Sequence, residues 1–277
     1  MRRAVLILAL ITLFSASTQA QTSDLVHASL VASVSTLKPG EPFTVGVLLK
    51  IKSGRHVYWS NPGDAGLPTR VQWTLPPGYS ASPLRFPVPL RIEEPGNIVV
   101  YGYTDQVLLT STITPSSLLA STDSTAIPIA AKVTWLCCDE NGCIPGKATV
   151  NLQLIPGQTS VPDHMQFFEQ WQNRLPTIAA ATPAPLVLSD PSPQTKIITP
   201  RQITDVKSII PGAADGLILT IGTPQATPTG TTIPLTVRVL KGQTVTATSF
   251  PILLTWPDPN GMNRLGEQIN VPIQSAH

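Results

Sequence analysis

Charged residues are scarce in this 277-residue sequence, and neither sign dominates. Lysine and arginine number 18 and aspartate and glutamate 16, so that 12% of the residues are charged and the formal net charge is +2. Binding to nucleic acid or to an anionic membrane surface depends on a strong excess of positive charge. We therefore expect no nucleic-acid partner.

The short motifs of common enzyme classes are also missing. There is no G-x-S-x-G, H-E-x-x-H, phosphate-binding loop or G-x-G-x-x-G, so neither a hydrolase nor a nucleotide-dependent enzyme is indicated, and no cofactor is expected. The histidines, His27, His56, His164 and His277, are scattered without metal-ligand spacing. A Cu(I) site formed by Cys137, a methionine and a histidine stays open as an alternative.

Long apolar runs are absent except at the N-terminus. Met1, Arg2 and Arg3 precede a mainly apolar run at 4–14, and small and polar residues follow up to Ala20. This order is typical of a secretory signal peptide, and the run is about half of the ~20 residues that a membrane-spanning helix needs. We expect residues 1–20 to be a signal peptide, cleaved near Ala20, and the mature chain to be periplasmic without a membrane span.

Short apolar segments separated by turn residues are abundant. Hydrophobic residues make up 42% of the chain, which also contains 29 prolines and 18 glycines. The strand-like segments of the first half are 43–49, 71–75, 107–113, 127–136 and 148–154. Seven or so short strands in about 130 residues are typical of an immunoglobulin-like β-sandwich. The pattern predicts an all-β protein with such a domain over 21–157.

The second half shows a different pattern. Apolar residues at helical spacing predict one helix at 163–174, and the Pro-, Ala-, Ser- and Thr-rich stretch 176–200 reads as a linker or the irregular edge of a second unit. Strand-like segments resume at 216–221, 233–240, 245–248 and 252–256. We predict a helix and Pro-rich linker over 158–200 and a smaller β domain over 201–277.

Only three cysteines occur, and two of them flank a turn. Cys138 and Cys143 stand on either side of Asn141-Gly142, a typical two-residue turn of a β-hairpin. Facing positions of antiparallel strands lie about 4.5 to 5.5 Å apart, within reach of a disulfide. Strand alternation places Cys137 on the opposite face, as a small core residue.

Two interpretations of this cysteine pair follow from the residues. A disulfide that closes so short a loop removes little entropy from the unfolded chain, so its value as a structural staple is small. At the tip of a hairpin it is also open to attack by a partner thiolate. Asp139 and Glu140 disfavour a thiolate here, which suits a carrier attacked by an activated partner. Thiol-disulfide exchange and a binding or scaffold protein with a structural disulfide both stay open.

A longer pattern runs through residues 25–155. It consists of HVYWSNPGDAGLPT at 56–69, Trp73 with LPPG at 75–78, Phe86-Pro87 with Pro89, Tyr101-Gly102-Tyr103, and WLCC at 135–138 with CIPG at 143–146. In order and spacing these motifs resemble the N-terminal periplasmic domain of the DsbD/ScsB family of protein-disulfide reductases.

The resemblance implies an immunoglobulin-like fold and a reversible Cys138–Cys143 disulfide. It implies electron flow from a thioredoxin-like or membrane-embedded thiol donor to oxidised periplasmic proteins, with Cys143 forming the mixed disulfide and Cys138 resolving it. A cap loop is implied near 95–101, although no aromatic residue precedes Tyr101 there. The family's membrane domain and thioredoxin-like C-x-x-C domain have no counterpart in the sequence, so we expect the donor to be a separate protein.

Overall fold

The computed structural model describes residues 24–115, 126–179, 186–187, 194–213, 216–240, 245, 247–257 and 264–274. The predicted signal peptide at 1–20 and His277 lie outside these ranges. Within them, no helix has the length and apolar character required to cross a membrane.

Twelve strands make up the first half of the described chain. Strands β1 to β12 are Val26–Ala32, Val34–Leu37, Phe43–Ile51, His56–Gly63, Arg70–Thr74, Tyr79–Ala81, Leu90–Glu94, Ile98–Tyr103, Gln106–Pro115, Ile127–Asp139, Gly142–Pro156 and Val161–Pro162. They form two sheets, one in the order β1-β3-β9-β6 and one in the order β12-β2-β11-β10-β4-β8-β7, with β5 beside β10. We call them the N-terminal unit.

The N-terminal unit is an immunoglobulin-like β-sandwich, as predicted. Its core is filled from both sheets because alternate residues of each strand point inward. Val47 and Leu109 come from one sheet, and Val133 and Trp135 of β10 come from the other, all of them buried in one cluster. Burial of these side chains supplies most of the driving force for the fold.

Nine further strands follow. Strands β13 to β21 are Thr177–Ile178, Leu186–Val187, Gln194–Thr199, Ile209–Pro211, Leu217–Ile221, Gln225–Thr227, Gly230–Val239, Ser249–Pro257 and Arg264–Gln274, and a 3-10 helix, η1, spans Val206–Ser208. They form a sheet β13-β21-β20-β16 with β14 beside β21, and a sheet β15-β19-β17 with β18 beside β19. These strands, which we call the C-terminal unit, enclose a separate buried cluster that includes Ile233 and Ile252.

The segment between the two units differs in part from expectation. The helix α1, Met165–Gln172, lies within the predicted range, and its Trp171 is buried in the N-terminal core. The stretch 176–200, expected as a linker or as the irregular edge of a second unit, contains β13, β14 and β15, which pair with β21 and β19 and so form edges of the C-terminal unit.

The strand predicted at 245–248 lies partly outside the described residues. Of its described residues, 245, 247 and 248 do not belong to a strand. Strand β20 begins one residue later, at Ser249, which pairs with Pro272 of β21.

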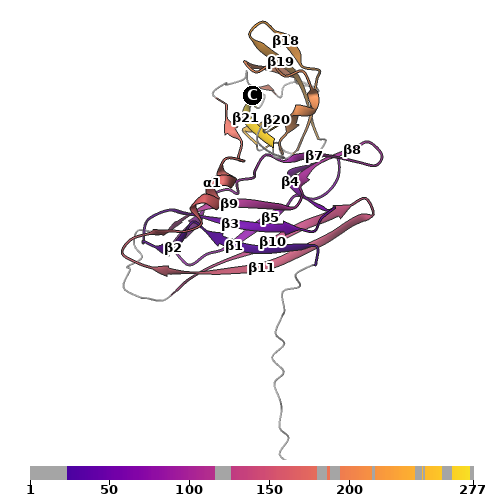
Figure 1. Ribbon diagram of the computed structural model, residues 1–277. Helices are drawn as coiled ribbons and strands as arrows, with labels where there is room; N and C mark the ends of the chain where they lie inside the picture. The colour runs from indigo at the N-terminus through magenta and orange to yellow at the C-terminus, as the bar shows by residue number, and fades with distance from the viewer. Residues whose placement is uncertain are drawn as a thin grey trace, which may run out of the picture.

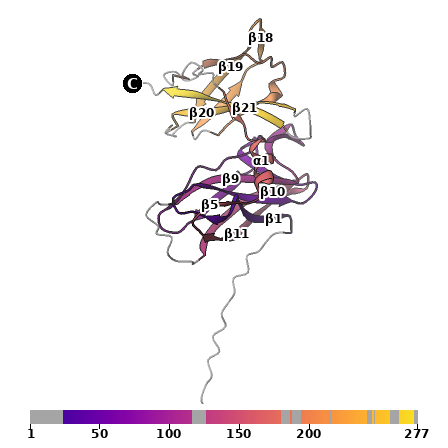
Figure 2. The same ribbon diagram turned by 60° about the vertical axis from the view of Figure 1, so that its left-hand side comes forward.

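The two units lie one on the other (Figures 1 and 2). In Figure 1 the C-terminal unit rests on the side of the sandwich where β4, β7, β8 and α1 lie, and in Figure 2 α1 again lies between the units. Ile210 and Leu253 of the C-terminal unit belong to the same buried cluster as Trp59 and Tyr101 of the N-terminal unit. The contact between the units is therefore partly apolar and closed to water.

Gly102 of β8 offers a test of the packing between β4 and β8. It pairs with Tyr58 of β4, and a Cβ atom added to it would lie 2.3 Å from the Val57 carbonyl oxygen. Because that neighbour is backbone, Gly102→Ala should cost about 1 to 3 kcal/mol of unfolding free energy. Urea unfolding followed by tryptophan fluorescence measures this.

Gly96→Ala provides the control. Gly96 has φ +85° with nothing within 4 Å of the added Cβ, so its cost should come from backbone conformation alone, about 1 kcal/mol. An equal or smaller cost for Gly102→Ala would contradict the described β4–β8 packing.

Candidate functional site

The β10–β11 hairpin places two cysteines opposite each other. Its register pairs Cys138 with Cys143, and the two form a disulfide. Cys137 is a free thiol buried on the other face, in the core of the N-terminal unit. Burial raises the pKa of the Cys137 thiol, although Arg55 acts in the opposite direction. The pairing and the faces predicted for the three cysteines are confirmed.

The turn of this hairpin lies one residue earlier than predicted. Asp139 pairs with Gly142, which is the first residue of β11, so the two loop residues are Glu140 and Asn141. The Asp139 Oδ1 atom accepts a hydrogen bond from the Asn141 N–H at 3.0 Å. This side-chain bond fixes the turn, and with Glu140 and Asn141 as the loop residues Cys138 lies directly opposite Cys143.

The two halves of the disulfide differ in accessibility. Cys138 is 0% exposed, whereas Cys143 and its neighbours Gly142 and Ile144 are exposed. An incoming thiolate can therefore approach the disulfide from the side of Cys143.

Tyr58 of β4 lies directly against the buried sulfur. Its hydroxyl donates a hydrogen bond to Cys138 Sγ at 3.0 Å and lies 3.8 Å from Cys143 Sγ. Burial, assisted by the nearby Glu94 carboxylate, raises the pKa of Tyr58 to about 12. The hydroxyl thus keeps its proton at neutral pH and remains a hydrogen-bond donor to sulfur.

The β7–β8 hairpin covers Cys138. Val100 of β8 is fully buried in one cluster with Tyr58 and Cys138, and Ile92 and Ile98 pack against this cluster. The cover lies where the cap loop was expected, and the residues that contact the cysteine cluster are aliphatic.

Two pairs of titratable side chains flank the disulfide, His56 with Glu94 and Arg55 with Asp139. His56, opposite Cys138 in the β4–β10 register, is 6% exposed, and its Nε2 atom lies 3.3 Å from the Glu94 carboxylate without hydrogen-bond geometry. Arg55 pairs with Asp139 at 2.5 Å. Of the two acidic residues that the sequence places beside the cysteines, Asp139 is therefore paired with Arg55.

The three histidines among the described residues do not gather around a common point. His27 lies on β1, His164 precedes α1, and His56 is beside the disulfide. Among the described residues, no group of three His, Cys, Asp or Glu side chains is close enough to hold a metal ion.

Sequence reasoning missed the individual roles of Tyr58, His56 and Glu94. One signal was available: His56 and Tyr58 are two residues apart on a strand, so they share a face. That this face meets Cys138 depends on the β4–β10 register, which no sequence pattern specifies.

Comparison with known proteins agrees with this geometry. The family model described as "Thiol:disulfide interchange protein DsbD, N-terminal" matches residues 22–154. A search of curated proteins found no match.

Two solved structures are similar to the chain. The N-terminal periplasmic domain of ScsB from Proteus mirabilis is 17% identical with a TM-score of 0.57, and the match covers 91% of this chain and 97% of that one. The DsbD N-terminal domain of Neisseria meningitidis, in the reduced form, is 14% identical with a TM-score of 0.27, over 48% and 90% of the two chains. At this identity the ScsB match shows the fold, and it extends over both units. From the family match and the paired cysteines, we conclude that residues 22–154 belong to the family of DsbD N-terminal domains.

Proposed function

We propose that the chain is an exported periplasmic thiol-disulfide exchange protein. It passes electrons from a thioredoxin-like or membrane-embedded thiol donor to oxidised periplasmic proteins, with Cys138 and Cys143 as its reacting residues. The observation that carries the proposal is the unequal burial of one disulfide, with Cys143 exposed and Cys138 buried against the Tyr58 hydroxyl.

In the reductive direction, a donor thiolate attacks Cys143 Sγ. A sulfur–sulfur bond to the donor forms, the Cys138–Cys143 bond breaks, and Cys138 leaves as a thiolate. A second donor thiol then attacks the donor sulfur of the mixed disulfide and releases Cys143. Two electrons and two protons have entered the protein, and the donor has become a disulfide.

In the oxidative direction the same residues act in reverse order. The Cys143 thiolate attacks one sulfur of an oxidised partner's disulfide and forms a mixed disulfide, while the partner's own sulfur–sulfur bond breaks and its second sulfur leaves as a thiolate. Cys138 then attacks Cys143 Sγ, re-forms the intramolecular disulfide and releases the reduced partner. The partner gains the two electrons.

Tyr58 fits the role of stabilising the leaving sulfur. Thiolates leave faster as their basicity falls, and a buried thiolate is costly without a hydrogen-bond donor. The Tyr58 hydroxyl is in place before the reaction, 3.0 Å from Cys138 Sγ, so stabilisation requires no rearrangement.

The surface around the exposed sulfur supports a protein partner. Leu67 is 62% and Ile144 47% exposed. Together with Pro68, Pro145 and Trp135 they line a groove of about 760 Å³ next to the hairpin. Exposed apolar residues favour contact with another protein, and Ile144 and Pro145 of this groove directly follow Cys143 in β11.

A structural disulfide on a binding or scaffold protein is the alternative. The two cysteines are only five residues apart, so the bond restricts the unfolded chain little. A disulfide that only stabilises the fold also gains no stability from exposure of Cys143.

Serine variants of the three cysteines test the assignment of roles. The partner is a thioredoxin-like protein with one active-site cysteine, supplied as a mixed disulfide with thionitrobenzoate. We expect Cys138→Ser to displace the thionitrobenzoate through Cys143 and accumulate a stable protein–protein disulfide, because no sulfur resolves it. Non-reducing gels and mass spectrometry detect this adduct.

The other two variants serve as controls for that experiment. Cys143→Ser should form little adduct, because its remaining sulfurs are buried. Reduced Cys137→Ser should react and resolve like wild type, at a cost of about 0.5 to 3 kcal/mol in stability. Loss of thionitrobenzoate release in Cys137→Ser but not in Cys143→Ser would show that the wrong pair has been chosen.

Tyr58→Phe tests the stabilisation of the leaving sulfur. Hydrogen bonds to charged groups contribute about 1.5 to 3 kcal/mol, so reduction by dithiothreitol should slow by about ten- to hundredfold. Tyr79→Phe, on β6 in the opposite sheet, is the matched control and should react at the wild-type rate. Equal stopped-flow rates for Tyr58→Phe and wild type would exclude this role.

His56 should make stability depend on pH. Burial lowers the pKa of His56 below its ordinary value of 6.5, while Glu94 and Asp139 act in the opposite direction. The unfolded chain then binds the proton more readily, so the unfolding free energy falls as pH drops from 6.5 toward the lower folded-state pKa. Urea unfolding between about pH 7.5 and 5.5 measures this loss.

His56→Phe keeps an aromatic ring and removes the titration, so it should flatten the pH dependence. His164→Asn, at an exposed position with φ 52°, should retain the wild-type slope. An unchanged slope in His56→Phe would rule out His56 as its source.

A further inference from the structure

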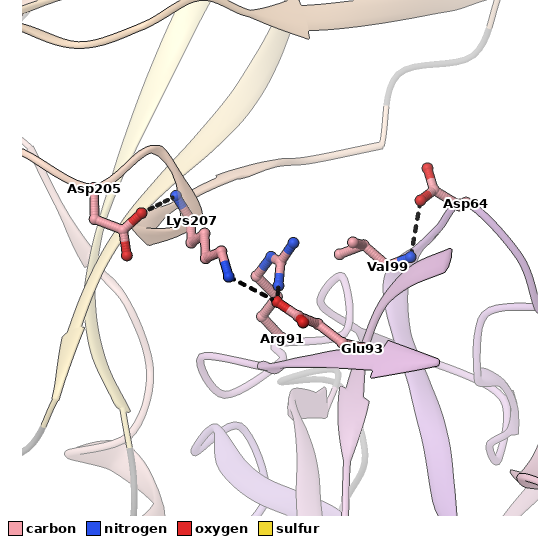
Figure 3. Close-up of polar contacts among 6 residues, drawn as sticks. All are labelled: Asp64, Arg91, Glu93, Val99, Asp205 and Lys207. Atoms are coloured by element: carbon pink, nitrogen blue, oxygen red, sulfur yellow. Dashed lines mark hydrogen bonds and ion pairs between the residues drawn. The ribbon is translucent and has the colours of Figure 1, made fainter. Parts of the chain in front are cut away.

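The hairpin that covers Cys138 is held from outside by the C-terminal unit. Glu93 of β7 accepts a hydrogen bond from Lys207 Nζ at 2.9 Å and also pairs with Arg91 (Figure 3). Lys207 lies on η1, where Asp205 Oδ1 accepts its backbone N–H at 2.9 Å. A fixed turn of the C-terminal unit therefore contacts the first strand of the cover.

The second strand of the cover is linked to the same unit through the end of β4. Asp64 exchanges two hydrogen bonds with Val99 of β8: its Oδ2 atom accepts the Val99 N–H, and its own N–H donates to the Val99 carbonyl, both at 2.9 Å. Three residues earlier, Asn61 Nδ2 donates to the carbonyl of Pro211 in β16 at 2.8 Å. Figure 3 shows Asp64 and Val99 beside the C-terminal unit.

Strand alternation connects these outer contacts to the disulfide. On β7, Arg91 and Glu93 point toward the C-terminal unit, whereas Ile92 and Glu94 point toward the site. Ile92 packs on the cluster that contains Cys138, and Glu94 lies 3.3 Å from His56. A shift of β7 at its outer face must therefore move the residues that cover the sulfur.

The C-terminal unit can act as a support because its own position is fixed. Ile210 and Leu253 are at most 1% exposed and lie in the N-terminal core cluster. Ile210 immediately precedes Pro211, the acceptor for Asn61. The anchor points on this unit are therefore tied to the sandwich independently of the hairpin.

We propose that Lys207 and Asn61 are positioning residues through which the C-terminal unit holds the β7–β8 hairpin over Cys138 and so directs exchange to Cys143. The claim that this hold directs exchange to Cys143 rests on the function proposed above. The hold on the cover itself can be measured without any exchange partner.

Alkylation of Cys138 measures opening of the cover. In a full-length Cys137→Ser, Cys143→Ser background Cys138 is the sole thiol, and its reaction with iodoacetamide requires exposure. Lys207→Met should speed alkylation by about two- to fivefold, as expected for loss of an exposed ion pair. Asn61→Ala should speed it by about two- to tenfold, as expected for loss of one hydrogen bond.

A double-mutant cycle assigns the effect to the contact. Glu93→Gln should resemble Lys207→Met, and the combined variant should react no faster than either alone. Lys38→Met is the matched control, because Lys38 forms a similarly exposed ion pair with Glu41 at 2.7 Å on a different part of the sandwich. It should alkylate at the background rate.

Hydrogen exchange of the 98–103 amides in the disulfide-bonded protein provides a second measurement that does not require the serine background. These amides should exchange faster in Lys207→Met and Asn61→Ala and not in Lys38→Met. Unchanged alkylation and exchange in the first two variants, or equal acceleration in Lys38→Met, overturns the proposal. If the thioredoxin-like adduct never forms but the expected ranking appears, the proposed exchange function fails while the support of the cover stands.

Discussion

The register of β10 is the constraint on which the disulfide site depends. The side chains of Val133, Trp135 and Cys137 point into the sandwich core, so the side chain of Cys138 must point away from that core, into the separate cluster under the β7–β8 hairpin. A slip of one residue would exchange the two faces and expose the large core side chains to water. The free energy that holds the core therefore also fixes that Cys138, rather than Cys137, forms the disulfide site, opposite Cys143 on one neighbouring strand and His56 on the other.

Burial of Cys138 has opposite consequences in the two redox states. A disulfide is uncharged, so the aliphatic cover of Val100, Ile92 and Ile98 suits the oxidised form. A thiolate in the same place must be solvated by the protein. Within the described residues, the group aimed at that sulfur is the Tyr58 hydroxyl, whose own burial keeps it protonated. The apolar surroundings that protect the disulfide thus also maintain the donor that a thiolate needs.

Much of the N-terminal unit could be predicted from sequence because its signals are local. Alternation, turn residues and the short spacing of the cysteines specify strands, a hairpin and a paired disulfide without knowledge of the fold. The turn was misplaced by one residue because Asn-Gly is a strong local signal, whereas the Asp139 side chain decides the loop by bonding to Asn141. Contacts between strands far apart in sequence, such as Tyr58 with Cys138, depend on sheet order and register, which local patterns do not specify.

The contacts that the C-terminal unit makes with the sandwich were also hard to predict, because they too join residues far apart in sequence. Its contacts with β4 and with the hairpin use a backbone carbonyl at Pro211 and single polar side chains, and these leave no periodic pattern in the sequence. Yet the same two-residue alternation that separates Cys137 from Cys138 also separates Glu93 from Glu94. In β10, successive side chains face either the core or the disulfide site. In β7, they face either the C-terminal unit or the disulfide site. In the proposed support of the cover, β7 alone links the Lys207 contact of one unit to the Cys138 sulfur of the other, because neighbouring side chains on one strand cannot move independently.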